Sequence, residues 1–501
     1  MDRVAALLII VALAGCGGGG GGGDDGFPFQ AGGGGGAGPV LGACGDGLTA
    51  PSRSFFSAQQ AYVKPASAEA RAGFGGALAL SAGGNVLVVG ARGDWDGSNG
   101  FAANLDDNSQ SSTGAAYVFA RNGTTWTQRA HLKPSNLSVG DGFGAAVAVS
   151  ADGNTIAIGA HGDSNVASAS GAVYIFACSA GAWSQQAYIK AANAGAGDRF
   201  GANVSLSADG NTLAVGAPNE DSSATNSGAV YVFTRSAAAW TPQAYIKASN
   251  VGAGDFFGSA VRLSADGDTL AVGAFHEDSA ATGVNGDQAD NSAPGAGAAY
   301  VFTRSGAAWT QQTYVKASNT DAGDEFGLHL ALSGDGNTLA VGARGEAGAD
   351  NSASSSGAVY VFTRSGAAWT HQAYVKASNA QTNDRFGRAV ALSANGDVLV
   401  VAAVDESSAA TGIDGDQTNN AAGLSGAAYE FVRSGAAWTQ VRYLKASNTG
   451  ARDFFGWSIA LSSDASTLAV GAPDEDSGAT GIDGNQADNS VVSAGAVYVF
   501  R

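Results

Sequence analysis

The sequence is poor in charged residues, in cysteine and in apolar runs long enough to cross a membrane. Only 14% of its 501 residues are charged, and 25 lysines and arginines face 43 aspartates and glutamates, for a net charge of −18. A surface of this sign repels nucleic acid and anionic lipid headgroups, so neither is expected as a partner. Cations and neutral ligands such as glycans are compatible with this charge.

The apolar run near the N-terminus covers residues 5–14, which is too short for a permanent membrane span. It leads into Leu13-Ala14-Gly15-Cys16, which resembles a bacterial lipobox. The resemblance implies that residues 1–16 are a lipoprotein signal peptide and that Cys16 is the lipidated first residue of the mature chain. An ordinary signal peptide with a chance cysteine is the alternative. Residues 17–50 are rich in glycine and predict a flexible tether. We therefore expect an exported protein, lipid-anchored at the bacterial outer membrane or cell surface.

Glycine, in contrast, is abundant, with 76 copies, and much of it belongs to a repeated unit. Seven units over residues 51–501 each begin with a Phe-Gly pair. Each pair is followed by four short runs rich in Val, Leu, Ile, Tyr and Phe, which predict strands A to D of an antiparallel meander. The pairs are Phe74-Gly75, Phe143-Gly144, Phe200-Gly201, Phe257-Gly258, Phe326-Gly327, Phe386-Gly387 and Phe455-Gly456.

Seven four-stranded units predict an all-β, seven-bladed propeller. The last unit ends with its third strand at Arg501, and the missing fourth strand matches residues 59–64, before the first Phe-Gly. We expect this N-terminal strand to complete the last blade and close the ring. Asp-Gly pairs such as Asp152-Gly153 predict type I′ turns between strands A and B, whereas Asp464-Ala465 predicts a different turn.

The units differ in length only between the alanine that ends strand B and the glycine that starts strand C. These B–C loops cover residues 92–113, 161–170, 218–227, 275–296, 344–356, 404–425 and 473–494. In a meander they share one face with the D–A connections between blades. Variable loops on a rigid scaffold are typical of a binding surface.

The Phe-Gly pairs, together with Gly216-Ala217-Pro218 and Gly471-Ala472-Pro473, resemble the FG-GAP repeat of integrin α subunits. The resemblance covers nearly all of residues 51–501 and implies an integrin α-like propeller that acts in adhesion and recognition. Calcium sites of such repeats lie in the A–B hairpin, which here is too short to supply six oxygens, so that site is not transferred.

The long B–C loops of blades 4, 6 and 7 are rich in aspartate and asparagine. Alternating oxygen-bearing side chains around a glycine suit a hard cation, so calcium is one hypothesis. Asx turns that brace the loop are the alternative. The candidate ligands are Asn285, Asp287, Asp290, Asp414, Asp416, Asp483, Asn485 and Asp488.

Two further cysteines, Cys44 and Cys178, are expected on the face opposite to these loops, where they could form a disulfide or stay as free thiols. The five histidines are not paired with a Cys or Ser nucleophile motif, so we expect no enzyme. The sequence favours a monomeric recognition or adhesion head that binds an extracellular protein or glycan, with or without calcium. A structural envelope scaffold and a carbohydrate-active enzyme are the alternatives.

Overall fold

The computed structural model describes residues 55–94, 112–136, 138–348 and 351–501. The chain divides into two compact units, residues 1–41 and 42–501, and all described residues belong to the second. The signal peptide, the tether predicted at residues 17–50, Cys16 and Cys44 all lie outside the described residues. No helix within the described ranges has the length and apolarity that a membrane crossing requires.

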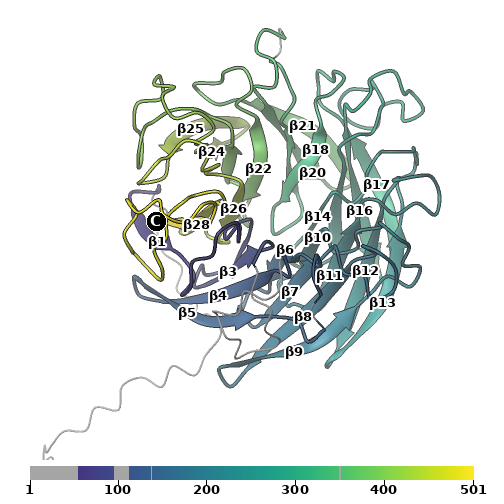
Figure 1. Ribbon diagram of the computed structural model, residues 1–501. Helices are drawn as coiled ribbons and strands as arrows, with labels where there is room; N and C mark the ends of the chain where they lie inside the picture. The colour runs from purple at the N-terminus through teal and green to yellow at the C-terminus, as the bar shows by residue number, and fades with distance from the viewer. Residues whose placement is uncertain (1–54, 95–111, 137, 349–350) are drawn as a thin grey trace, which may run out of the picture. The chain divides into compact units, whose positions relative to one another are not determined.

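The described strands form seven antiparallel sheets of four strands each, arranged as the blades of a propeller (Figure 1). This confirms the predicted all-β, seven-bladed fold. In blades 1 to 3 the strands are β2 (Ala77–Leu80), β3 (Val86–Ala91), β4 (Ala115–Asn122), β5 (Thr125–Leu132); β6 (Phe143–Val149), β7 (Thr155–Ala160), β8 (Ala172–Ser179), β9 (Ala182–Ile189); and β10 (Asn203–Leu206), β11 (Thr212–Ala217), β12 (Ala229–Ser236), β13 (Ala239–Ile246).

Blades 4 to 7 repeat this order, and the last blade takes its outer strand from the start of the described chain. The strands are β14 (Ala260–Leu263), β15 (Thr269–Ala274), β16 (Ala298–Ser305), β17 (Ala308–Val315); β18 (Phe326–Leu332), β19 (Thr338–Ala343), β20 (Ala358–Ser365), β21 (Ala368–Val375); β22 (Phe386–Leu392), β23 (Val398–Ala403), β24 (Ala427–Ser434), β25 (Ala437–Leu444); and β26 (Ser458–Leu461), β27 (Leu468–Ala472), β28 (Ala496–Phe500), β1 (Gln59–Val63).

The core lies between the blades. The second strand of a blade, such as β11, is buried along its whole length because neighbouring sheets cover both of its faces. The apolar clusters each combine two adjacent blades, and one of them joins Ala61 and Val63 of β1 to Leu87 and Val89 of β3. A blade therefore buries its apolar faces only when both neighbours are present.

The Phe-Gly pair fixes the distance between neighbouring blades. All seven Phe-Gly phenylalanines are fully buried. Phe143 packs edge-on against Tyr174 of β8, 5.5 Å away. Gly144 has φ +89°, and a Cβ on it would lie 2.2 Å from the carbonyl oxygen of Ala115 in the preceding blade. The predicted close backbone approach at this glycine is thus confirmed.

The A–B turns differ from the prediction. In the turn at 150–153 only Gly153 has a positive φ, +74°, and its N–H donates to the Ser150 carbonyl at 3.0 Å. A type I′ turn needs positive φ at both central residues, so that prediction was wrong. Ala465 also adopts a positive φ, +58°, and bonds Ser462 in the same way, so the predicted departure there was wrong too. The feature that recurs in all seven turns is the serine, whose Oγ accepts from the backbone N–H five residues further on.

The ring is closed by β1, which pairs antiparallel with β28. Tyr62 lies opposite Tyr498 and Gln59 opposite Phe500, as the repeat arithmetic predicted. The inner strand β2 packs against β26, so blade 1 contacts blade 7 in the same way as any other neighbour. The Tyr62 ring is fully buried, and its hydroxyl donates to Glu475 Oε1 at 2.9 Å.

Because Tyr62 holds the closing strand, we expect Tyr62→Ala to lower the free energy of unfolding by about 3–5 kcal/mol. Tyr245 occupies the same repeat position in blade 3 but is 46% exposed, so Tyr245→Ala serves as the matched control, with a loss below about 1 kcal/mol. Chemical denaturation of both variants measures the difference. Equal losses would contradict the argument that the burial of Tyr62 holds the closing strand.

One core position in blade 6 carries a charge. Glu430 of β24 stands where other blades have Val or Ile, and it is only 3% exposed. Its Oε2 has no hydrogen-bond partner within the described residues, and Arg442 lies opposite on β25. Burial raises the pKa of Glu430 to about 7. The ionised carboxylate therefore destabilises the folded state.

A raised folded-state pKa means that the stabilising contribution of Glu430 is complete below pH 4.5 and is lost as the pH rises to about 7. Glu430→Gln should thus stabilise the protein at pH 8, by about 3 kcal/mol at most, and change it little at pH 4. Thermal melts at the two pH values measure this. The exposed Asp221→Asn variant is the control, and a stabilisation equal at both pH values would refute the argument.

Candidate functional site

The long B–C loops return along the outer strand of their own blade. Asn285 Oδ1 accepts from the backbone N–H of Tyr314 in β17 at 3.0 Å. Asp414 does the same with Tyr443 of β25, and Asp483 with Tyr62 of β1, both at 2.9 Å. These three predicted calcium ligands therefore pin the loops to the rim of the propeller.

The other predicted ligands accept hydrogen bonds from backbone N–H groups two residues further on. Asp287, Asp416, Asn485, Asp290 and Asp488 each form such a bond, at 2.9–3.1 Å. These are Asx turns, the bracing alternative given above. Among the described residues no cluster of three or more His, Cys, Asp or Glu side chains could hold a metal ion. Calcium binding by these loops stays a prediction.

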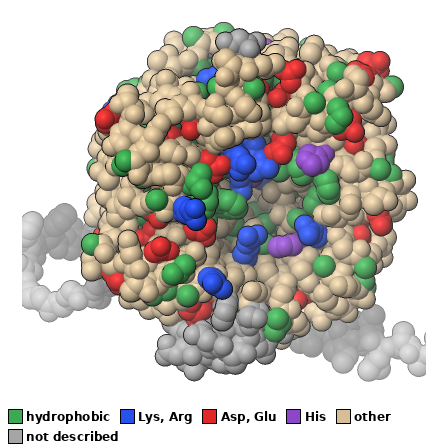
Figure 2. All heavy atoms as spheres, turned by 45° about the horizontal axis from the view of Figure 1, so that its top comes forward, with side chains coloured by type: hydrophobic (Ala, Val, Ile, Leu, Met, Phe, Trp, Pro, Cys, Tyr) green, Lys and Arg blue, Asp and Glu red, His purple; other side chains and the backbone are tan. Residues whose placement is uncertain are grey.

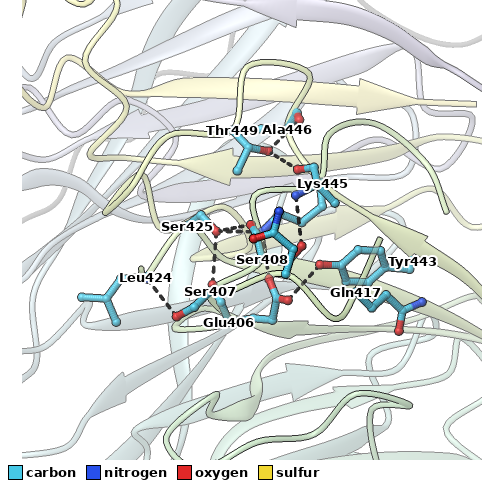
Figure 3. A network of polar contacts seen from close by, with 12 residues as sticks. Glu406, Ser407, Ser408, Gln417, Leu424, Ser425, Tyr443, Lys445, Ala446 and Thr449 are labelled. Atoms are coloured by element: carbon cyan, nitrogen blue, oxygen red, sulfur yellow. Dashed lines mark hydrogen bonds and ion pairs between the residues drawn. The ribbon is translucent and has the colours of Figure 1, made fainter. Parts of the chain in front are cut away.

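A buried ion pair anchors the start of each B–C loop. In blade 6, Lys445 Nζ donates to Glu406 Oε2 at 2.8 Å and to Ser425 Oγ at 2.7 Å, and Tyr443 donates to Glu406 Oε1 at 2.9 Å (Figure 3). Burial lowers the pKa of Lys445, and Glu406 opposes that shift. Asn379, from the preceding D–A connection, donates to the same carboxylate at 3.2 Å, so the cluster joins neighbouring blades.

The same pair recurs in every blade. The lysine comes from the end of strand D and the acid from the beginning of the B–C loop, with N–O distances of 2.7–3.4 Å. The pairs are Lys64–Glu475, Lys133–Asp94, Lys190–Asp163, Lys247–Glu220, Lys316–Glu277, Lys376–Glu346 and Lys445–Glu406. The loops thus leave the sheets in a fixed direction on one face.

A cavity of about 740 Å³ lies at the axis of that face. The inner strands, the D–A connections and the starts of the B–C loops line it. Its wall does not repeat around the ring: the residue after Phe-Gly is small in four blades, whereas three consecutive blades carry Leu328, Arg388 and Trp457. A site with these residues can orient a ligand in one way, which a seven-fold symmetric wall cannot.

Arg388 is the centre of the cavity wall. Its guanidinium lies over the Trp457 ring at 4.2 Å, and its Nη1 lies 2.6 Å from His329 Nε2. Since a guanidinium only donates, His329 Nε2 is an unprotonated acceptor. Burial lowers the pKa of Arg388 to about 10, and the nearby Arg344 contributes. Burial and the same arginines lower the pKa of His329.

The cavity is basic although the chain is acidic. Five arginines and one carboxylate, Asp474, line it. Lys and Arg side chains gather around the central hollow of this face, with histidine beside them (Figure 2). The arginines are Arg71, Arg92, Arg262, Arg344 and Arg388.

The family profile of the FG-GAP repeat matches six segments, at residues 126–176, 183–233, 240–302, 309–362, 369–431 and 438–500. The chain belongs to the FG-GAP repeat family. Each matched segment begins at the tryptophan of one blade's outer strand and ends at the third strand of the next blade. An FG-GAP repeat therefore spans two blades, and its interior is the packed interface between them.

Among solved structures, the propeller is similar to the periplasmic gluconolactonase PpgL of Pseudomonas aeruginosa, with 15% sequence identity and a TM-score of 0.45. The alignment covers 75% of this chain and 85% of the gluconolactonase. A similarity of this size carries no conclusion about activity or ligand. No curated protein matches the chain.

Sequence reasoning missed both the ion pairs and the basic cavity. A lysine that recurs at one position of each FG-GAP unit, in a chain with few charges, was a signal that a partner recurs as well. The cavity gave no comparable signal, because its five arginines are spread over four repeat positions, and only Arg92 and Arg344 share one. Cys178 at the end of β8 is disulfide-bonded. Cys44 lies outside the described residues, so the pairing of the two stays a prediction.

Removing one member of a fully buried ion pair should strongly destabilise the protein. We expect Lys445→Met to cost about 3–5 kcal/mol, because Glu406 is left buried without its cation. Lys247, whose side chain is 14% exposed, provides the matched control, and Lys247→Met should cost less. Urea denaturation measures both.

The double variant Glu406→Leu/Lys445→Met should recover part of that stability, since it leaves no unpaired charge. A double variant no more stable than Lys445→Met alone would show that the loss comes from packing rather than charge.

Proposed function

We propose that this FG-GAP propeller is an exported recognition module that binds a protein or glycan in and around the axial cavity. The observation that carries the proposal is the asymmetric wall: Leu328, Arg388 and Trp457 stand at a position that holds a small residue in the other four blades. Packing and ring closure require the repeated residues, whereas nothing in the fold requires these three. A cavity of about 740 Å³ also has the size of a ligand site.

The proposal includes export, lipid anchoring through Cys16 and a monomeric head, as the N-terminal sequence predicts. The disulfide at Cys178 supports an oxidising compartment. We further propose that the protein binds its ligand without chemical conversion, and that calcium, if it binds, stiffens the rim loops.

The test is a screen of the full-length protein on glycan and envelope-protein arrays, followed by a cavity-filling variant. Ala202 lines the cavity, so Ala202→Trp should weaken binding of any ligand found by about tenfold or more. Ala238 lies in the exposed turn after β12 on the opposite face, and Ala238→Trp should leave binding unchanged. Loss of binding in Ala238→Trp alone, or no ligand on either array, would overturn the proposal.

A further inference from the structure

Among the described residues, four of the five cavity arginines lack a direct ion pair, although Asp474 lies near Arg92 and Asp405 near Arg388. Arg344 forms an ion pair with Glu325. Arg71, Arg92, Arg262 and Arg388 form no ion pair with a carboxylate within the described part of the chain. Like charges gathered in a partly enclosed space repel one another and raise the free energy of the empty protein, unless an anion neutralises them.

Arg262 and Arg388 keep most of their N–H donors free of partners among the described residues. Arg262 Nη1 donates to the Val261 carbonyl at 2.8 Å and to Asn203 Oδ1 at 3.1 Å. One nitrogen of Arg388 contacts His329, and one face of its planar guanidinium lies over the Trp457 ring. A guanidinium has five N–H donors in a planar fork, and the fork fits the two oxygens of a carboxylate or phosphate.

His329 orients this fork without adding a charge. Its Nε2 accepts from Arg388, so the ring is neutral, and burial together with the surrounding arginines keeps its pKa low. Arg388 is thereby held between an imidazole and an indole. A preorganised cation loses little conformational freedom when an anion arrives.

Part of the remaining wall is apolar and favours an organic molecule over a bare ion. Leu78, Val204 and Ile459 contribute aliphatic surface, and Phe275 and Trp457 contribute aromatic rings. The volume of about 740 Å³ far exceeds that of a small inorganic anion. Aromatic and aliphatic surface beside charged donors suits the apolar face of a sugar ring that carries an acidic group.

We propose that the axial cavity binds a small organic anion of saccharide size and holds its carboxylate or phosphate on the cavity arginines. This inference rests on the proposed function and names the ligand class of the same site. The chain's net charge of −18 repels large polyanions, whereas a single acidic group reaches the local positive potential of the cavity.

The test is isothermal titration calorimetry of the full-length protein with matched probes. Trigalacturonate carries carboxylates, its methyl ester has the same rings without charge, and glucose 6-phosphate carries a phosphate. We expect trigalacturonate, glucose 6-phosphate or both to bind, and the ester to bind at least about tenfold more weakly than the acid if the acid binds. Binding should also weaken as the salt concentration rises.

Arginine variants test whether the cavity arginines bind the acidic group. Arg388→Gln and the exposed Arg92→Gln should each weaken binding of the acidic probe by about tenfold or more. Arg433→Gln is the control, because Arg433 stacks on Trp438 at an outer strand, away from the cavity. Arg92 is exposed and makes no ion pair within the described residues, so its variant keeps the test valid even if Arg388→Gln fails to fold.

The outcomes separate this inference from the proposed function. If acid and ester bind equally and Ala202→Trp abolishes both, the cavity is a ligand site but its arginines do not select anions, and the inference fails alone. If no anionic probe binds at millimolar concentration, the inference also fails, while the array screen decides the proposed function independently. Weaker binding in Arg433→Gln than in Arg388→Gln would likewise overturn it.

Discussion

Strand β1 hydrogen-bonds along β28, and this one pairing joins the beginning of the described propeller to its end. Each blade is covered on both faces by its neighbours, so a ring with one open seam would expose two apolar faces at once. The fully buried Tyr62 and the bond from its hydroxyl to Glu475 place the closing strand within the core instead of on its surface. All seven interfaces, and the axis at which they meet, depend on this closure.

The buried lysine–carboxylate pairs fix the direction in which each B–C loop leaves its blade. Two ions buried together stabilise a fold only modestly, but either ion without its partner is costly, so the pair enforces one arrangement. In this propeller the lysine ends the outer strand and the acid begins the B–C loop. The loop therefore starts in the same direction in every blade, although its length and sequence vary. In the longer loops, Asn285, Asp414 and Asp483 then bond the backbone of the outer strand and hold the loop against the rim.

The cavity at that axis shows how a symmetric scaffold holds an asymmetric site. The small residues that follow Phe-Gly in four blades keep the backbone ring narrow without filling it, and Leu328, Arg388 and Trp457 occupy one side. Its arginines make the local electrostatic potential positive, although the net charge of the chain is negative. Because potentials inside a concave, poorly solvated wall are screened less than at the surface, the nearest charges outweigh the net charge of the chain.

The sequence by itself determined the number of blades, the order of strands and the closing strand, because these follow from a repeat whose signals are local. The Phe143-Gly144 pair predicted the close approach of neighbouring blades. The match of residues 59–64 to the fourth strand of the repeat predicted which segment closes the ring. The A–B turn was mispredicted, since only Gly153 of the Asp-Gly pair has a positive φ, and the turn is braced by the serine that begins it, Ser150. Only the tertiary structure brought Lys445 to Glu406 and placed Arg92, Arg262, Arg344 and Arg388, from four different blades, around one cavity. The spacing of these arginines along the chain does not predict that they line one cavity. Ring closure and the twist of each blade decide which side chains face the axis.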